Sequence, residues 1–144
     1  MVMAFYDRDC YQMCIQKPPD CFAKELYDRY DETFSNYLTN HSYPAIISKS
    51  DKFLIQELVK RWQDHTVMMK WMYDLFRYID RYYVGRNSKD NLKELALMRF
   101  RTLVFTRVKS AATTALLDMI KKDRDGEEND RDLLKAAIRV CALS

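Results

Sequence analysis

The sequence predicts an all-α fold, a bundle of long helices, on the basis of three observations. Its 144 residues include only two glycines and three prolines, whereas sheet-rich folds need frequent turns, in which Gly and Pro are favoured. Nearly half of the residues are hydrophobic, enough to bury a core. Apolar residues also recur at helical spacing along most of the chain. The length suits one domain, expected over residues 1–144.

The first half of the chain predicts three helices. Residues 3–15 form a short one, which ends before Pro18-Pro19 because proline disfavours helical geometry there. Residues 20–39 form the second, whose inward face repeats every fourth position at Phe22, Leu26, Tyr30, Phe34 and Leu38. A break or bend is expected at residues 41–44. A third helix follows, with inward Ile47, Leu54, Leu58 and Trp62.

The next predicted helix begins at Asp64 as its N-cap and reaches Val84, with Gly85 at the C-terminal cap. Its inward stripe consists of Met68, either Trp71 or Met72, Leu75, Ile79 and Tyr82. The opposite face carries Lys70, Asp74, Arg77 and Arg81, and Tyr78 falls among these charges.

The second half predicts helices over residues 92–107 and 109–122 and a last helix after the turn at residues 125–129. Either Asn129 or Asp130 caps that last helix, whose apolar residues are Leu133, Leu134, Ala137 and Val140. The expected core includes Leu26, Phe34, Leu58, Trp62, Leu75, Ile79, Leu116 and Leu134.

Charge and composition argue against several functional classes. The 24 basic and 21 acidic residues are interleaved, whereas nucleic-acid binders gather their basic residues on one face, so no nucleic-acid partner is expected. No apolar run approaches the roughly 20 residues of a membrane span, so no membrane is expected either. Four cysteines without a CxxC pair, and no secretory signal, indicate a reducing compartment, either cytoplasm or nucleus.

Residues suited to catalysis or metal binding are sparse. His41 and His65 lie far apart in sequence and lack a metal-ligand spacing. Cys10 and Cys14 are four residues apart and share a helix face, as half a metal site would, but no matching second pair exists, and buried thiols explain them better. The expectation is a protein that is not an enzyme and needs no cofactor or metal.

Two segments are candidates for protein–protein contact. The helix over residues 3–15 has apolar groups on both faces, and only one face can dock on its own bundle. Tyr78 has two interpretations, a tyrosine at the core edge with its hydroxyl in water or an interface anchor, because Tyr and Arg are frequent at hot spots.

Five segments, taken in order, resemble the first repeat of plant SCF-class cullins. They are residues 11–19 (YQMCIQKPP), 26–30 (LYDRY), 61–65 (RWQDH, similar to a W-x-x-H element), 78–84 (YIDRYYV, similar to Y-L-D-R-Y) and 124–135 (RDGEENDRDLLK). The resemblance covers nearly the whole chain. It implies a single cullin N-terminal repeat-like domain over residues 1–144, a cullin-repeat-like bundle of long helices.

The resemblance also implies a function. In SCF-class cullins this repeat binds a Skp-family adaptor, which holds an F-box protein and its substrate for ubiquitin-dependent degradation. The expected role is therefore a scaffold or binding module. The adaptor-contact positions correspond to Met3, Ala4, Tyr6, Asp7, Tyr11, Asp74, Tyr78 and Arg81.

This sequence departs from the family pattern in two ways. Met3 and Asp7 stand where the family usually has aromatic residues, and Ala4 is smaller than usual. The C-terminal region that binds a RING-box protein in full cullins has no counterpart here, so no RING-box partner is expected. The alternatives to an adaptor-binding module are a competitor of full-length cullins and an inactive truncated remnant.

Overall fold

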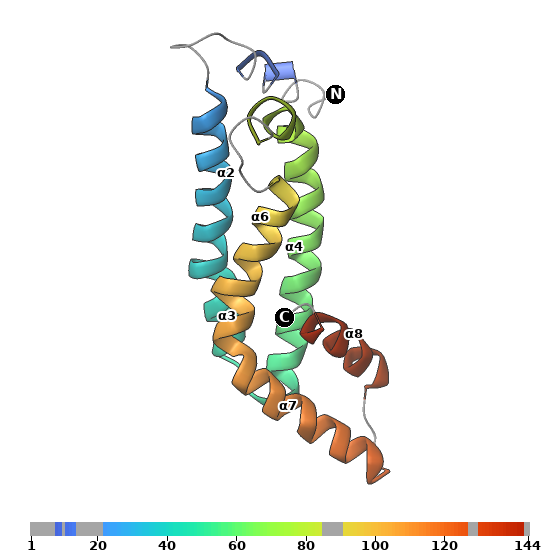
Figure 1. Cartoon of the computed structure of the whole chain (residues 1–144). Coiled ribbons are helices and arrows are strands. Elements are labelled where there is room, and N and C mark those ends of the chain that lie inside the picture. The colour runs from blue at the N-terminus through green and yellow to red at the C-terminus, as the bar shows by residue number, and fades with distance from the viewer. Residues whose placement is uncertain (1–7, 10, 14–21, 85–90, 127–129, 143–144) are drawn as a thin grey trace. The chain divides into compact units, whose positions relative to one another are not determined.

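The computed structural model describes residues 8–9, 11–13, 22–84, 91–126 and 130–142, and every regular element within these ranges is helical (Figure 1). The all-α prediction is confirmed. No helix in this part of the chain is both long and apolar enough to cross a membrane. The elements are α2 (Ala23–Tyr37), η1 (Leu38–Ser42), α3 (Tyr43–Ile47), α4 (Asp51–Ile79), η2 (Asp80–Val84), α6 (Leu92–Phe100), η3 (Arg101–Phe105), α7 (Thr106–Arg124) and α8 (Arg131–Cys141), where η denotes a π-helical turn.

The chain groups into two compact units. Unit 1 takes its described residues from 1–35 and 66–98, and unit 2 takes them from 36–65 and 99–144. Helices α2, α4 and α6 each contribute residues to both units. The expectation of one domain over residues 1–144 stays a prediction.

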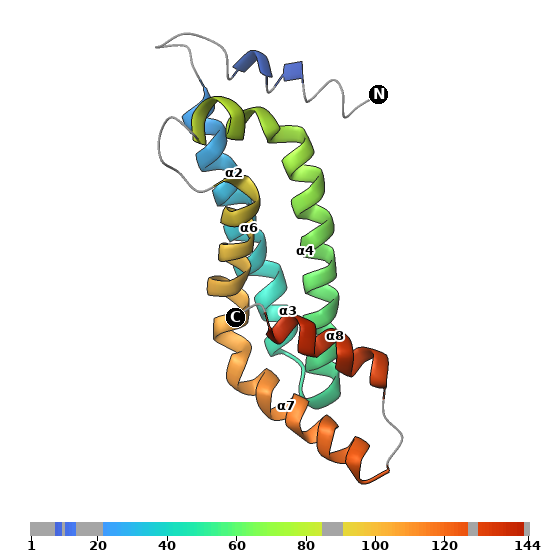
Figure 2. The ribbon, with the colours of Figure 1, turned by 45° about the vertical axis from the view of Figure 1, so that its right-hand side comes forward.

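The core of unit 1 is rich in aromatic residues. The parts of α2, α4 and α6 that belong to this unit lie side by side (Figure 2). Phe34 and Ile79 are fully buried there, and the Tyr30 ring packs against Phe34 with ring centroids 4.8 Å apart. The other buried members are Ala23, Tyr27, Tyr83, Leu92, Leu95 and Ala96.

The core of unit 2 is mostly aliphatic. It is built from η1, α3, the first half of α4, the end of α6, η3, α7 and α8. Trp62 packs edge-on against Phe100 at 5.0 Å between ring centroids. The fully buried members are Leu38, Ile46, Ile55, Leu58, Val104, Val108, Ala112 and Ala137.

The inward face of α2 was predicted correctly at Tyr30 and Phe34 but was one residue off in the first two turns. The buried residues are Ala23, Tyr27, Tyr30 and Phe34, whereas Phe22, predicted inward, precedes the helix and is exposed. Four residues turn a helix by about 400°, so a strict repeat of four drifts by about 40° at each step. A mixed spacing of three and four keeps one face inward, which is what the chain adopts.

Of the predicted break or bend at residues 41–44, the break is wrong, because the chain stays helical from Ala23 to Ile47 and departs from α-helical geometry there as a π turn. The turn η1 takes up this region, and the Tyr43 amide donates to the Leu38 carbonyl, five residues back. Pro44 follows this turn directly and cannot donate a backbone hydrogen bond, so a departure from α-helical geometry beside it is expected. The chain leaves the helix only at residues 48–50.

The predicted helix start at Asp64 is also wrong, because α4 begins at Asp51 and continues through Asp64 as far as a kink at Phe76. Asp64 is exposed in the middle of this helix, while the apolar spacing continues past it on the buried face through His65 and Met68. Ile47, predicted inward, is 46% exposed, whereas the neighbouring Ile46 is the buried residue of α3. Gly85, the predicted C-terminal cap, lies outside the described residues.

The second half of the chain follows its prediction closely. Residues 92–124 are helical throughout, with η3 in the middle, and Gly126 follows α7 with φ +80°, a conformation that glycine adopts without strain. Asp130 is the N-cap of α8, since its carboxylate accepts from the Leu133 amide at 3.0 Å. Of the two predicted caps, the structure selects Asp130.

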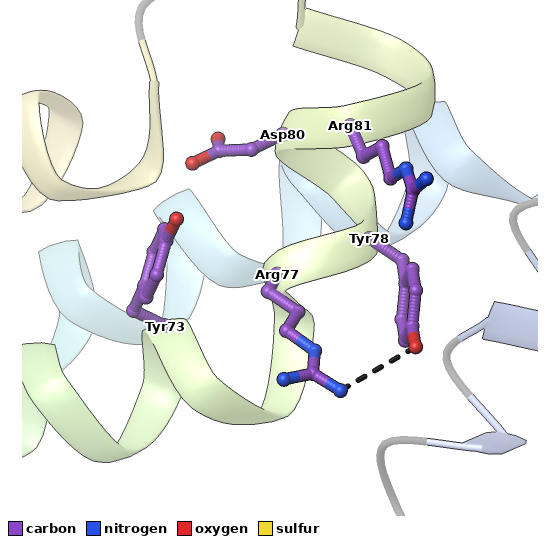
Figure 3. A pocket seen from close by; sticks show the side chains of 5 residues that line it. All are labelled: Tyr73, Arg77, Tyr78, Asp80 and Arg81. Atoms are coloured by element: carbon purple, nitrogen blue, oxygen red, sulfur yellow. Dashed lines mark hydrogen bonds between the residues drawn. The ribbon is translucent and has the colours of Figure 1, made fainter.

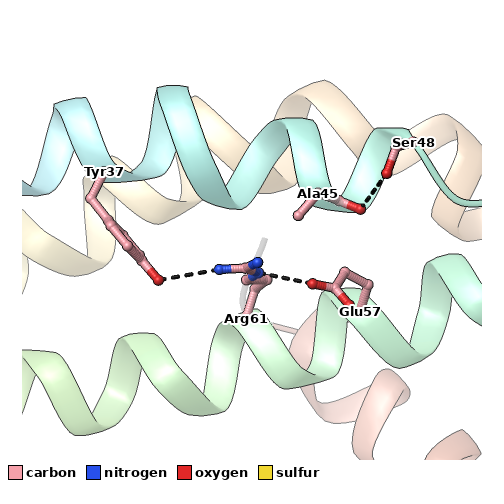
Figure 4. Close-up of polar contacts among 5 residues, drawn as sticks. All are labelled: Tyr37, Ala45, Ser48, Glu57 and Arg61. Atoms are coloured by element: carbon pink, nitrogen blue, oxygen red, sulfur yellow. Dashed lines mark hydrogen bonds and ion pairs between the residues drawn. The ribbon is translucent and has the colours of Figure 1, made fainter.

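A polar network within unit 2 links α2 to α4 (Figure 4). Arg61 donates through Nε to Glu57 at 2.9 Å and through Nη1 to the Tyr37 hydroxyl at 3.2 Å. Both charged side chains are mostly buried, 20% exposed for Arg61 and 13% for Glu57. Folding removes most of the water around these two charged groups, and a buried charge is costly unless it is paired and hydrogen-bonded. Arg61 and Glu57 meet this need by bonding to each other.

Candidate protein-interaction site

Two segments far apart in sequence meet at Tyr78. Tyr11, from the short helical stretch at residues 11–13, places its ring 4.9 Å from the Tyr78 ring, tilted by 60°. Both rings are partly buried, so each keeps a face toward solvent. Aromatic pairs at this separation attract each other beyond the area that they bury. The contact fixes Tyr11 against the end of α4 within unit 1.

A surface hollow of about 460 Å³ opens beside this pair (Figure 3). It is lined by Tyr73, Arg77, Tyr78, Asp80 and Arg81. Arg77 donates to the Tyr78 hydroxyl at 3.4 Å, and its guanidinium carbon lies 5.2 Å from the centre of the same ring. The Tyr78 ring is thus held by Tyr11 and by a guanidinium, which leaves a preorganised aromatic group among charges.

The backbone under the site departs from α-helical geometry twice. Phe76 has φ −113° and ψ 17°, which kinks α4, and η2 follows at residues 80–84. Phe76 is partly buried and meets Tyr30 edge-on at 6.2 Å between ring centroids. Such π turns are frequent at functional sites because they turn side chains away from the regular helical register.

Asp80 fastens this end of α4 to the start of α6. Its carboxylate accepts from the Leu92 amide at 2.9 Å, while the Tyr30 hydroxyl donates to the Leu92 carbonyl at 3.0 Å. Burial raises the pKa of the Asp80 carboxyl, although the Leu92 hydrogen bond opposes that rise. Burial, together with the nearby Asp80, also raises the pKa of the Tyr30 phenol. The backbone amide and the backbone carbonyl of Leu92 therefore both form hydrogen bonds with side chains of unit 1.

The structure brings together part of the predicted site. Tyr11 contacts Tyr78, and Arg81 lines the hollow with it. Asp74 is exposed on α4, one turn before Tyr78, and is not among the hollow's lining residues. The other four predicted contact positions, Met3, Ala4, Tyr6 and Asp7, lie outside the described residues.

Sequence reasoning left Tyr73, Arg77 and Asp80 out of the site. Arg77 was assigned to the charged face of its helix, and its position next to Tyr78 and four residues before Arg81 was the available signal. Asp80 lies inside the segment that resembles the cullin motif, but nothing in that motif identifies the Leu92 amide as its partner. For Tyr73 the sequence offered no signal, because it belongs neither to the predicted inward stripe nor to the predicted charged face.

The sequence predicts no metal site. Within the described ranges no cluster of three or more His, Cys, Asp or Glu side chains is placed to hold a metal ion. Cys10 and Cys14 fall outside those ranges. His65 is buried among aromatic rings, 5.0 Å from Phe100 and 6.0 Å from Trp62 between centroids, as a core histidine would be.

Comparison with known proteins identifies the family. The chain is 41% identical to cullin-1 of Oryza sativa subsp. japonica and 38% identical to cullin-2 of Arabidopsis thaliana, each over 130 residues and 90% of this chain. It is 31% identical to cullin-like protein 3 of Arabidopsis thaliana over 96% of this chain. The chain spans 18% of the length of each of those two cullins and 53% of the cullin-like protein. Because residues 1–143 also match the family model of the cullin alpha solenoid domain, the chain belongs to the cullin family.

Proposed function

We propose that this chain is a non-catalytic scaffold module that binds a Skp-family adaptor of SCF-type ubiquitin ligases. The observation that carries the proposal is the contact between Tyr11 and Tyr78. It joins in one surface the two segments that the resemblance to SCF-class cullins assigns to adaptor binding. This role suits a protein of the cytoplasm or nucleus.

The surface around Tyr78 has the physical character of an interface. An aromatic pair stands at its centre, and charged Arg77, Arg81 and Asp74 surround it. Protein interfaces combine a core rich in Tyr and Arg with a polar rim, and a few such residues supply most of the binding free energy. The contact with Tyr11 restricts the Tyr78 ring before a partner binds, which lowers the side-chain entropy lost on binding.

Replacing Tyr78 with Ala is expected to weaken adaptor binding by at least about 2 kcal/mol, near thirtyfold in affinity. Titration calorimetry against a purified Skp-family adaptor measures the change. Leu117→Ala is the matched control, because Leu117 is 61% exposed on α7 in unit 2 and far in sequence from the proposed site. Equal affinity of Tyr78→Ala and the parent chain would refute this surface as the adaptor site.

Asp7 supplies a second arm of the same experiment. It stands where the family usually has an aromatic residue, and a carboxylate facing an apolar partner costs binding free energy unless it is paired. Asp7→Tyr is therefore expected to tighten adaptor binding. If the parent chain gives no heat at high micromolar concentrations, the chain is instead a remnant without this partner, and if it displaces a full-length cullin from the adaptor, it acts as a competitor.

A further inference from the structure

Two large apolar side chains on α4 point into solvent near the proposed site. Trp71 is 53% exposed and Val67 is 56% exposed. The neighbouring Met68 and Met72 pack into the core of unit 1 in their place. An exposed tryptophan is informative, because a side chain of this size usually finds a buried position.

These two residues are continuous with the proposed adaptor surface. Val67 and Trp71 are four residues apart, and Asp74 is three residues beyond Trp71, all within the regular part of α4 that precedes the kink at Phe76. Residues three and four apart are neighbours on a helix surface. Lys70 and Asp74, both exposed, flank Trp71. An apolar pair thus adjoins a charged rim that already belongs to the proposed site.

The apolar pair Val67 and Trp71 is too small to form an interface alone and is better explained as part of a larger one. Stable interfaces bury roughly 1,200 Å² or more in total, and an entire Trp or Phe side chain buries only about 150–250 Å². Val67 and Trp71 are therefore too small to hold a second copy of the chain by themselves. The surface that adjoins them is the one proposed to bind the adaptor.

We propose that Val67 and Trp71 extend the adaptor-binding surface along α4 and pack against an apolar patch of the same Skp-family adaptor. This inference rests on the proposed function. Trp71 is the anchor of the extension, since tryptophan is the residue type most enriched among binding hot spots. Val67 widens the apolar contact, and Lys70 and Asp74 border it.

Substitution separates the extension from the rest of the site. Trp71→Ala is expected to weaken adaptor binding at least about tenfold and Val67→Ala about threefold, in line with their apolar areas. Trp71→Phe should recover most of the affinity because it restores an aromatic ring. Phe53→Ala is the control, since Phe53 is 64% exposed on the same helix but belongs to unit 2, and it should stay within about twofold of the parent.

A direct readout comes from the two tryptophans of the chain, Trp62 and Trp71, labelled with 5-fluorotryptophan. On addition of unlabelled adaptor, the fluorine resonance of Trp71, assigned with Trp71→Phe, should shift, while that of Trp62, which is packed against Phe100, stays in place. The extension is overturned, and the proposed function stands, if Tyr78→Ala loses affinity while Trp71→Ala binds as tightly as the parent. In that case the Trp71 resonance of the parent chain should also stay unmoved when adaptor is added. If the parent does not bind the adaptor at all, the proposed function fails and the extension fails with it.

Discussion

The buried core of unit 1 is rich in aromatic side chains, whereas that of unit 2 is mostly aliphatic. In unit 1, Tyr27, Tyr30, Phe34 and Tyr83 are buried together, and a tyrosine hydroxyl ties α2 to the backbone at Leu92. In unit 2, the buried set consists mainly of Leu, Ile, Val and Ala, with Phe100 and Phe105 as its buried aromatic rings.

The tyrosines of unit 1 serve both the core and the candidate site. A tyrosine has an apolar ring and a polar tip, so it can fill a core or face water with little change in backbone. Tyr30 takes the first role in unit 1 and Tyr78 takes the second. Partly buried rings beside guanidinium groups occur in both units, at Tyr78 and Arg77 in unit 1 and at Tyr43 and Arg107 in unit 2. The ring in unit 1 also contacts a second tyrosine, Tyr11, from a distant segment of the chain.

The largest expected effects come from the fully buried centres of the two units. Phe34→Ala in unit 1 should lower the free energy of unfolding by about 3–5 kcal/mol, and Leu58→Ala in unit 2 by about 2–5 kcal/mol, because each leaves a cavity. Chemical denaturation measures both changes. A loss below about 1 kcal/mol for either would show that its neighbours collapse into the space, and that its unit lacks a close-packed core.

Removing one tyrosine hydroxyl from each unit tests how much the hydrogen bonds of these hydroxyls contribute to the free energy of unfolding. Tyr30→Phe should cost about 1–2 kcal/mol, because it leaves the carbonyl of fully buried Leu92 without that donor. Tyr37→Phe in unit 2 should cost less than about 1 kcal/mol, since Tyr37 is partly exposed and Arg61 retains Glu57. Similar losses in thermal or urea denaturation would contradict the proposed difference between the two cores.

The smallest effect is expected at Asp80. Asp80→Asn keeps an acceptor for the Leu92 amide and removes a charge whose burial is unfavourable. At neutral pH the variant should therefore be as stable as the parent, or more stable by less than about 1 kcal/mol. Asp80→Ala, which removes the acceptor, is the matched comparison and should be less stable than both.

The difference in stability between Asp80→Asn and the parent depends on pH with a defined sign. The pKa of Asp80 is raised above 3.8 in the folded chain, so the folded chain binds the proton more tightly than the unfolded chain does. As pH falls through the folded-state pKa toward about 3.8, the parent gains stability relative to Asp80→Asn, and the difference narrows. A difference that widens in this range would show that the carboxylate stabilises the folded state as an anion.

Much of the fold was predictable because it depends on local chemistry. The scarcity of Gly and Pro and the apolar spacing predicted helices, and the pattern around Asp130 predicted the last cap. The two wrong boundaries, at residues 41–44 and at Asp64, have one cause. Pro44 and Asp64 are helix-start residues by preference, but a continuous apolar face on either side outweighs a single-residue preference.

The candidate site was predictable only in outline. Resemblance to the cullin family pointed to Tyr11, Asp74, Tyr78 and Arg81. The choice between Trp71 and Met72 for the core could not be made from periodicity, because adjacent residues lie only about 100° apart on a helix. The kink at Phe76 and the bond from Leu92 to Asp80 depend on tertiary contacts that no local pattern encodes.

The π turns have a consequence for how the chain tolerates changes in length. Each of the described turns η1, η2 and η3 is a single wide turn of five residues. The turns η1 and η3 each connect two α-helices, and η2 follows α4. A wide turn accommodates one more residue than an α-helical turn does, without rotating the segment that follows. Loss of one residue inside η1 or η3 would therefore restore an ordinary helix and leave the downstream faces in place. The same loss in the middle of α4 or α7 would rotate every later side chain by about 100°. Natural variation in length should accordingly gather at these turns.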